Sequence, residues 1–109
     1  MSDSLGEFEQ IVLLAILRLG ANAYGVPIRA EIMRCTDRNP TAGALYTVLD
    51  RLEGKAMVRS RMGESTAARG GRPKRFFNVT SKGELAVTRA QLAYQKLMNG
   101  LKLTEAINA

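Results

Sequence analysis

A change of hydrophobic period at Gly54 constrains the fold of this chain more than any other feature. The apolar residues before it recur at helical spacing: Leu45, Val48, Leu49 and Leu52. One face of this helix therefore enters a core. After Gly54, residues 56–62 and 75–80 alternate apolar with basic or polar side chains, which is typical of strands with one buried face. A helix is therefore followed directly by two strands.

Three further segments are predicted to be helices, covering residues 5–19, 24–34 and 81–108. Ser4 and Ser81 are the expected N-caps of the first and last of these, because each precedes a glutamate by three residues, the spacing of a capping box. The helix that ends at Gly54 is expected to begin at Pro40, with Asn39 as its N-cap.

The order of these elements predicts a mainly α protein with a small β-hairpin (α+β). It is the order of a winged helix-turn-helix followed by a C-terminal dimerisation helix. We expect residues 1–80 to form the DNA-binding domain and residues 81–109 the dimerisation helix. The segment between the strands is rich in glycine and is expected to form a long hairpin tip.

Composition excludes several classes of enzyme. Among its 109 residues the chain has no histidine and one cysteine, Cys35, so histidine-based triads, Cys/His zinc sites and internal disulfides are absent. No paired carboxylates supply a general acid and base. We therefore predict that the chain is not an enzyme and has neither cofactor nor metal. Cys35 is expected to be a small packing residue.

The longest apolar run, residues 11–17, is far shorter than the roughly 20 residues that span a bilayer. The residues before it lack the basic cluster of a signal peptide. We expect a cytoplasmic protein without a membrane partner.

Positive charge is concentrated in one quarter of the chain. Between Arg51 and Arg75 lie eight basic and two acidic residues, so this window carries the whole net charge of +6. One positive surface of this kind attracts polyanions. A solvated basic face without a partner is the alternative.

The helices at 24–34 and 40–53, with a short polar break between them, have the lengths of a helix-turn-helix, whose second helix enters the DNA major groove. A helical hairpin without a DNA role has the same pattern. Small or hydrogen-bonding side chains begin the second helix, and glycines and cations form the hairpin tip. The candidate DNA-binding residues from these segments are Arg38, Asn39, Thr41, Ala42, Tyr46, Arg51, Gly71, Arg72 and Lys74.

The last predicted helix carries an apolar stripe that a single small domain cannot bury. We expect a two-fold homodimer in which this helix pairs with the first helix of the other subunit. A helix folded back on its own domain is the alternative. The candidate dimerisation residues are Phe8, Val12, Ala90, Ala93, Tyr94, Leu97 and Leu101.

Four short motifs occur in a characteristic order: Leu-Leu-Ala-Ile-Leu at 13–17 followed by Tyr24-Gly25, Gly-Ala-Leu-Tyr at 43–46, Gly-Gly-Arg-Pro-Lys-Arg-Phe-Phe at 70–77, and Thr-Ser-Lys-Gly at 80–83. In this order and spacing the chain resembles the PadR family of bacterial transcriptional regulators, in its short, single-helix type. The resemblance implies a homodimeric repressor that binds a pseudo-palindromic operator and is released by a small molecule, often a planar aromatic. It adds Tyr24 to the DNA-facing residues.

Two positions depart from the family pattern. Ala44 stands where the family often has threonine, and the chain has no tryptophan, the residue on which multidrug-binding members stack their ligands. The predicted function is a sequence-specific, dimeric DNA-binding regulator with half-sites about 34 Å apart. The alternatives are an RNA-binding or architectural basic protein, and a protein–protein adaptor that uses its last helix.

Overall fold

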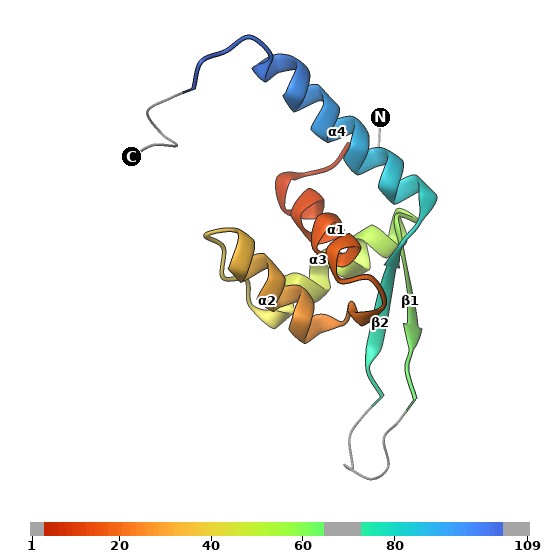
Figure 1. The fold of residues 1–109 in the computed structure, drawn as a ribbon. Coiled ribbons are helices and arrows are strands. Elements are labelled where there is room, and N and C mark those ends of the chain that lie inside the picture. Colours follow the sequence, from red (N-terminus) through yellow and green to blue (C-terminus); the bar gives the residue numbers. More distant parts are fainter. Residues whose placement is uncertain (1–3, 65–72, 104–109) are drawn as a thin grey trace.

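The computed structural model describes residues 4–64 and 73–103. Within them it contains four α-helices and one antiparallel pair of strands, arranged as Figure 1 shows. The order is α1 (Glu7–Leu19), a 3₁₀ turn (Gly20–Asn22), α2 (Gly25–Cys35), α3 (Ala42–Gly54), β1 (Val58–Met62), β2 (Arg75–Val79) and α4 (Ser81–Met98). The predicted α+β class and order of elements are confirmed.

Helix α1 lies at the centre of the molecule and packs against α2, α3, α4 and β2. This position explains why its sequence is apolar on most sides, because a helix covered on several faces needs no polar stripe. Its core residues are joined by apolar residues of every other element. The fully buried large side chains include Leu13, Ile16, Ile28, Ile32, Leu45, Leu49, Leu52, Met57 and Phe77.

The two strands pair antiparallel, with Ser60 opposite Phe77 and Arg61 opposite Phe76. Because successive side chains point to opposite faces, Phe77 enters the core while Arg59 and Arg61 are exposed, as the alternation predicts. The first strand begins at Val58, two residues later than predicted. Ala56, just before it, has a φ of 61°, a left-handed turn that interrupts the strand pattern.

The N-caps of three helices differ from the predicted ones. Gly6, and not Ser4, caps α1, and its N–H donates to the Glu9 carboxylate at 2.8 Å. Thr80, and not Ser81, caps α4, because its hydroxyl accepts the Gly83 N–H at 3.1 Å.

The start of α3 is corrected in the same way. Thr41 is the N-cap in place of Asn39, and its Oγ1 accepts the Ala44 N–H at 3.0 Å. The Asn39 side chain instead accepts a hydrogen bond from Arg29 Nη2 at 2.9 Å. Arg29 Nε also donates to the Pro40 carbonyl at 2.5 Å, so one arginine of α2 holds the turn in place.

Helix α4 has an inner half that packs on the core through Gly83 and Val87 and an outer half that is exposed. Val87 is buried, and a Cβ at Gly83 would lie 2.2 Å from the Met57 carbonyl oxygen, so the helix begins in close contact with the body. The helix ends at Met98, well before the predicted end at residue 108. Gly100 follows with a φ of +85°. Figure 1 shows α4 on one side of the molecule and the hairpin projecting from the opposite side.

No helix in residues 4–64 and 73–103 combines the length and hydropathy needed to cross a membrane.

Candidate nucleic-acid interface

The N-terminal half of α3 presents a surface of small side chains. Thr41, Ala42, Gly43, Ala44 and Thr47 are all exposed, whereas the opposite face of the helix supplies buried leucines and a valine to the core. Such a surface allows a helix backbone to come close to the base edges of a major groove. The sequence predicted this division of faces from the helical period alone.

Tyr46 connects this surface to α2. Its ring packs against Phe77 at a centroid distance of 6.3 Å, and the side chain is half-buried. A Cβ at Gly25 would lie 2.4 Å from the Tyr46 hydroxyl oxygen. Glycine at this position therefore lets the hydroxyl lie against the first turn of α2, at the edge of the exposed surface.

Tyr24, just before α2, is joined to the base of the hairpin. It forms an isolated β-bridge with Phe76, and the two rings meet edge to face at 5.4 Å. Lys74 places its Nζ 4.5 Å from the centroid of the Tyr24 ring and 3.4 Å from its hydroxyl oxygen. Two residues that are 50 positions apart thus form one exposed polar and cationic group beside α3.

A second arginine-centred contact joins β2 to α3. Arg75 pairs with Asp50 and Glu53, and Glu53 also accepts a hydrogen bond from the Ser60 hydroxyl at 2.8 Å. The Ser60 hydrogen bond, together with the Arg75 guanidinium, lowers the pKa of Glu53 against a smaller opposing effect of burial. These contacts fix the hairpin against the helix. The sequence identifies Arg75 as a cation of the basic window and of the 70–77 motif, but its partners on α3 are 22 and 25 residues away and could not be named from it.

Two more of the candidate DNA-binding residues have partners elsewhere in the chain. Arg38 forms an ion pair with Glu7 and lies 5.4 Å above the centroid of the Phe8 ring, and Asn39 is held by Arg29. Both partners are distant in sequence, so no local pattern could have revealed these contacts.

The remaining candidates divide into one exposed residue and two outside the described chain. Arg51 is exposed on α3 and close enough to contribute to the lowered pKa of Glu9. Gly71 and Arg72 lie outside the described residues. Of the other candidates, Lys74 contacts Tyr24, and Tyr46 lies against Gly25, the residue after Tyr24. Thr41 and Ala42 are exposed at the start of α3, about one turn before Tyr46.

The candidate dimerisation residues also divide. Ala93, Tyr94, Leu97 and Leu101 are exposed, and Ala90 and Phe8 are half-buried. Val12 has no exposed surface and lies in the core of its own chain, so it is not available to a second subunit. The period of α1 could not separate Val12 from a surface position because apolar residues surround the whole helix.

A buried ion pair near the base of α4 was not foreseen. Glu9, in α1, accepts from Lys55 Nζ at 2.9 and 3.1 Å. Burial raises the pKa of Glu9, but the Lys55 and Gly6 hydrogen bonds outweigh that effect and lower it overall. Gln91 Nε2 donates to Gln10 Oε1 at 3.3 Å. These contacts tie α4 and the α3–β1 turn to α1.

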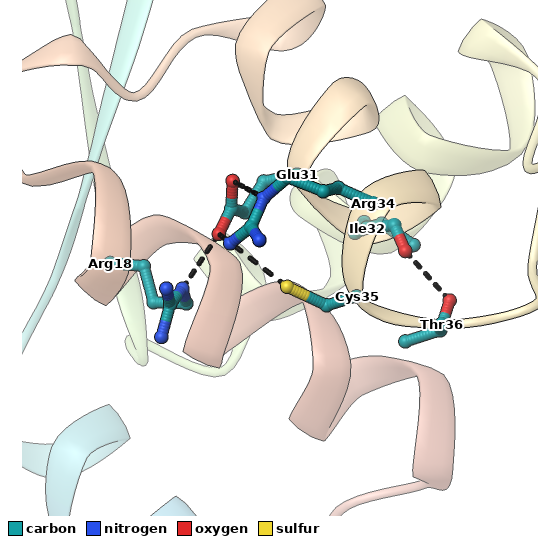
Figure 2. Close-up of polar contacts among 6 residues, drawn as sticks. All are labelled: Arg18, Glu31, Ile32, Arg34, Cys35 and Thr36. Atoms are coloured by element: carbon teal, nitrogen blue, oxygen red, sulfur yellow. Dashed lines mark hydrogen bonds and ion pairs between the residues drawn. The ribbon is translucent and has the colours of Figure 1, made fainter.

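A separate polar cluster lies on α1 and α2, away from α3 (Figure 2). Glu31 pairs with Arg18 and Arg34 at 2.6 Å each, and Cys35 Sγ lies 3.5 Å from the same carboxylate. The Arg34 and Arg18 hydrogen bonds lower the pKa of Glu31 to about 2. Cys35 was expected to be a small packing residue, but it is exposed at the last position of α2. Among the described residues, no group of histidines, cysteines and carboxylates could hold a metal.

An exposed helix of a helix-turn-helix beside a cationic hairpin defines a winged-helix protein. Comparison with known proteins agrees: the family model described as "Transcriptional regulator PadR-like family" matches residues 13–89. The chain belongs to this PadR-like family, whose members are DNA-binding transcriptional regulators and not enzymes.

Several solved structures share the fold. A PadR-like transcription factor from Bacteroides fragilis has 24% sequence identity and a TM-score of 0.68, with 83% of this chain and 82% of that chain covered. A PadR family regulator from Clostridium difficile R20291 has 24% identity and a TM-score of 0.67, with coverages of 84% and 95%.

The likeness extends to a viral protein. F93 from STIV, described as a winged-helix DNA-binding protein, has 20% identity and a TM-score of 0.65, covering 85% of this chain and 92% of that one. No curated protein sequence matches this chain.

Proposed function

We propose that this chain is a homodimeric repressor that binds a pseudo-palindromic DNA operator and is released from it by a small molecule. The observation that carries the proposal is the exposed small-residue face of α3 lying beside Tyr24, Tyr46 and Lys74. Uncharged small residues flanked by hydroxyl and ammonium groups suit a helix that lies in the major groove between two phosphate backbones.

Within this proposal, the residues have different roles. Thr41 and Ala42 begin the helix that enters the groove, and Thr41 is both helix cap and base contact. Tyr24, Tyr46 and Lys74 bind backbone phosphates through hydroxyl and ammonium groups. Gly71 and Arg72 lie outside the described residues. We assign them to DNA binding together with Lys74, because the sequence gives this segment positive charge and backbone freedom. Arg51 contributes longer-range attraction.

The outer half of α4 is the proposed dimerisation arm. Leu92, Tyr94, Leu97, Met98 and Leu101 are exposed large side chains within ten residues. Exposed apolar side chains this densely clustered are typical of an interface between proteins. Phe8 and the exposed side of α1 are the proposed receiving surface on the second subunit. Because Val87 is buried in the body, we place the beginning of the arm near Ala90.

The proposed effector site is the groove between the N-terminal segment and α4. It has a volume of about 430 Å³, and its lining includes both apolar side chains and two cations, Lys82 and Arg89. The groove is lined by Ser4, Leu5, Met57, Lys82, Leu85, Ala86, Arg89 and Ala90. A small aromatic molecule bound here would act through the angle between α4 and the body, and it can shift that angle only by its differential affinity for the two arrangements.

Fluorescence anisotropy with duplex DNA over a series of salt concentrations tests the binding surface. Lys74→Ala is expected to weaken binding to all sequences and to reduce the salt slope by about 0.9, the loss of one phosphate contact. Thr41→Ala is expected mainly to relax sequence preference. Thr41→Ser, which retains both the cap and the hydroxyl, is its matched control. Unchanged affinity and slope for Lys74→Ala would remove Lys74 from the interface.

Repression and release are tested in a reporter assay. An operator selected from a random pool of duplex DNA is placed upstream of the reporter gene. The proposal predicts lower expression with the protein present and recovery with an effector. Increased expression would contradict the assignment as a repressor. An effector that still acts on a variant with the groove filled by Ala86→Phe would contradict the proposed effector site.

A further inference from the structure

Arg75 makes contacts with both acidic residues of α3. Its Nη2 lies 2.6 Å from Glu53 Oε1 and its Nη1 lies 3.2 Å from Asp50 Oδ1. The guanidinium carbon lies 4.9 Å above the centroid of the Phe77 ring. Asp50 and Glu53 are the only carboxylates in the sequence of α3. The single positive charge of Arg75 is thus shared between the two carboxylates of the helix and partly neutralises them.

The position of Asp50 makes this neutralisation matter for DNA. Residues three, four and seven apart share one face of a helix, so Asp50 lies on the same exposed face as Thr47 and Gly43. Its side chain is 64% exposed. An unpaired carboxylate on that face would repel the phosphates on either side of the groove, and like charges at an interface are costly.

Arg75 is itself poorly placed to bind DNA. Its side chain is only 31% exposed, and its two terminal nitrogens face the two carboxylates. Adjacent residues of a strand point to opposite faces, and Lys74 correspondingly extends towards Tyr24. The two neighbouring cations of the motif are thus turned in different directions, one to the surface and one to the helix.

We propose that Arg75 is a positioning residue for DNA binding: it masks the carboxylates of α3 and holds the hairpin at a fixed distance from that helix, without contacting the DNA. The planar guanidinium can donate to two carboxylates in a fixed fork while it stacks on an aromatic ring, whereas a lysine ammonium is a point charge without that fixed geometry. The hydrogen bond from Ser60 to Glu53 connects β1 to the same group. This inference rests on the proposed binding surface and adds to it a residue whose role is indirect.

A double-mutant cycle on DNA affinity distinguishes masking from direct contact. Arg75→Met keeps an apolar stem over Phe77 and removes the charge. It is expected to weaken binding roughly tenfold at low salt, the effect of unmasking a charge close to phosphates. Adding Asp50→Asn is expected to recover at least about threefold of that loss, because the exposed charge is removed. In the unmodified chain, where Asp50 is already paired, Asp50→Asn is expected to change affinity by less than about twofold.

Arg61→Met is the matched control. Arg61 lies on the same hairpin and also stacks on a phenylalanine, with its guanidinium carbon 4.7 Å from the centroid of Phe76, but on the opposite face of the sheet. The same charge is lost without unmasking Asp50, so Asp50→Asn should recover nothing in this background. Arg75→Lys, which keeps the charge but lacks the fixed fork, is expected to bind with intermediate affinity and guards against loss of folding in Arg75→Met.

Two results would overturn the inference. If Arg75→Met and Arg75→Lys bind as tightly as the unmodified chain, no masking is needed. The second result is an equal loss of affinity for Arg75→Met alone and for Arg75→Met combined with Asp50→Asn. If the salt slope also falls by about 0.9, Arg75 is a phosphate contact. In both cases the unmodified chain still binds DNA, so the proposed function stands. Only failure of the unmodified chain to bind duplex DNA would overturn both.

Discussion

Gly25 and Gly43 lie in the same helix-turn-helix and are used differently. A Cβ at Gly25 would lie 2.4 Å from the Tyr46 hydroxyl oxygen and 3.1 Å from the adjacent ring carbon. A Cβ at Gly43 would meet no atom within 4 Å. Packing within the chain therefore requires a glycine at position 25. It does not require one at position 43, where an added Cβ would affect only the exposed surface of α3.

Gly25→Ala is expected to lower the free energy of unfolding by about 1–3 kcal/mol, the cost of overpacking a tight contact. Tyr46→Phe in the same background should recover part of it by removing the hydroxyl. Gly43→Ala is the control, expected to be neutral or to stabilise the helix by up to about 1 kcal/mol. Urea denaturation measures all three. Equal effects of Gly25→Ala and Gly43→Ala would contradict the close approach of Tyr46 to α2.

The ion pairs of Glu31 predict a specific acid dependence. Its folded-state pKa of about 2 lies below its ordinary value of 4.5, so its contribution to stability is fully present above pH 4.5 and is lost as the pH falls towards 2. The difference in unfolding free energy between the unmodified chain and Glu31→Gln should therefore shrink over that range. Because the pairing arginines are exposed, high salt should reduce the difference at every pH. A difference independent of pH between 4.5 and 2 would show that the pairs do not form in solution.

At the scale of elements, the start of α3 has a local determinant that can be separated from its neighbour. Thr41→Ala removes the side-chain cap and is expected to cost about 1 kcal/mol of unfolding free energy, whereas Thr41→Ser should retain it. Asn39→Ala, which removes an exposed hydrogen bond to Arg29, should cost less. Thermal unfolding monitored by circular dichroism compares the three variants. A larger loss for Asn39→Ala than for Thr41→Ala would favour Asn39 as the cap.

Hydrophobic period predicted all four α-helices of the described residues and both strands, most clearly for α3, which buries one regular face. Helix starts were less predictable: Ser4, Asn39 and Ser81 all have cap-forming side chains, but the N-caps in the structure are Gly6, Thr41 and Thr80. Asn39 was drawn to Arg29, ten residues earlier in the chain. Local propensity cannot anticipate such a partner.

The candidate site was also predicted only in part. The exposed face of α3 follows from the spacing of its buried residues, so Thr41 and Ala42 could be named from sequence. The pairing of Arg38 with Glu7 and of Arg75 with Asp50 spans 31 and 25 residues. Charge counting treats these arginines like Lys74, although their partners within the chain differ.

At the scale of the whole molecule, the outer half of α4 determines the expected assembly. Leu97→Glu is expected to weaken dimerisation by roughly 30-fold or more, as the loss of a central interface residue does. Val26→Glu is the control, because Val26 on α2 is as exposed as Leu97, at 74% against 75%, and lies outside the proposed interface. Sedimentation equilibrium measures both variants. A monomeric unmodified chain, or a dimer unaffected by Leu97→Glu, would contradict the proposed arm.

Assembly was the least predictable level. The apolar stripe of the last helix indicated a partner, but the sequence did not divide that helix into an inner half packed on the core and an exposed outer half. Val12 illustrates the limit from the other side: on a helix that is apolar all round, period alone cannot distinguish a core position from an interface position.

In the proposed assembly, two copies of this chain place two α3 helices in successive major grooves of one DNA duplex. Selection from a random duplex pool is the decisive experiment, with the affinity of the winning sequence measured against a scrambled copy. A dimer of this kind should enrich an inverted repeat with half-site centres one helical turn, about 34 Å, apart, with a specificity ratio of about 10³ or more. Binding without an enriched repeat, or tighter binding to structured RNA at equal salt, would contradict it.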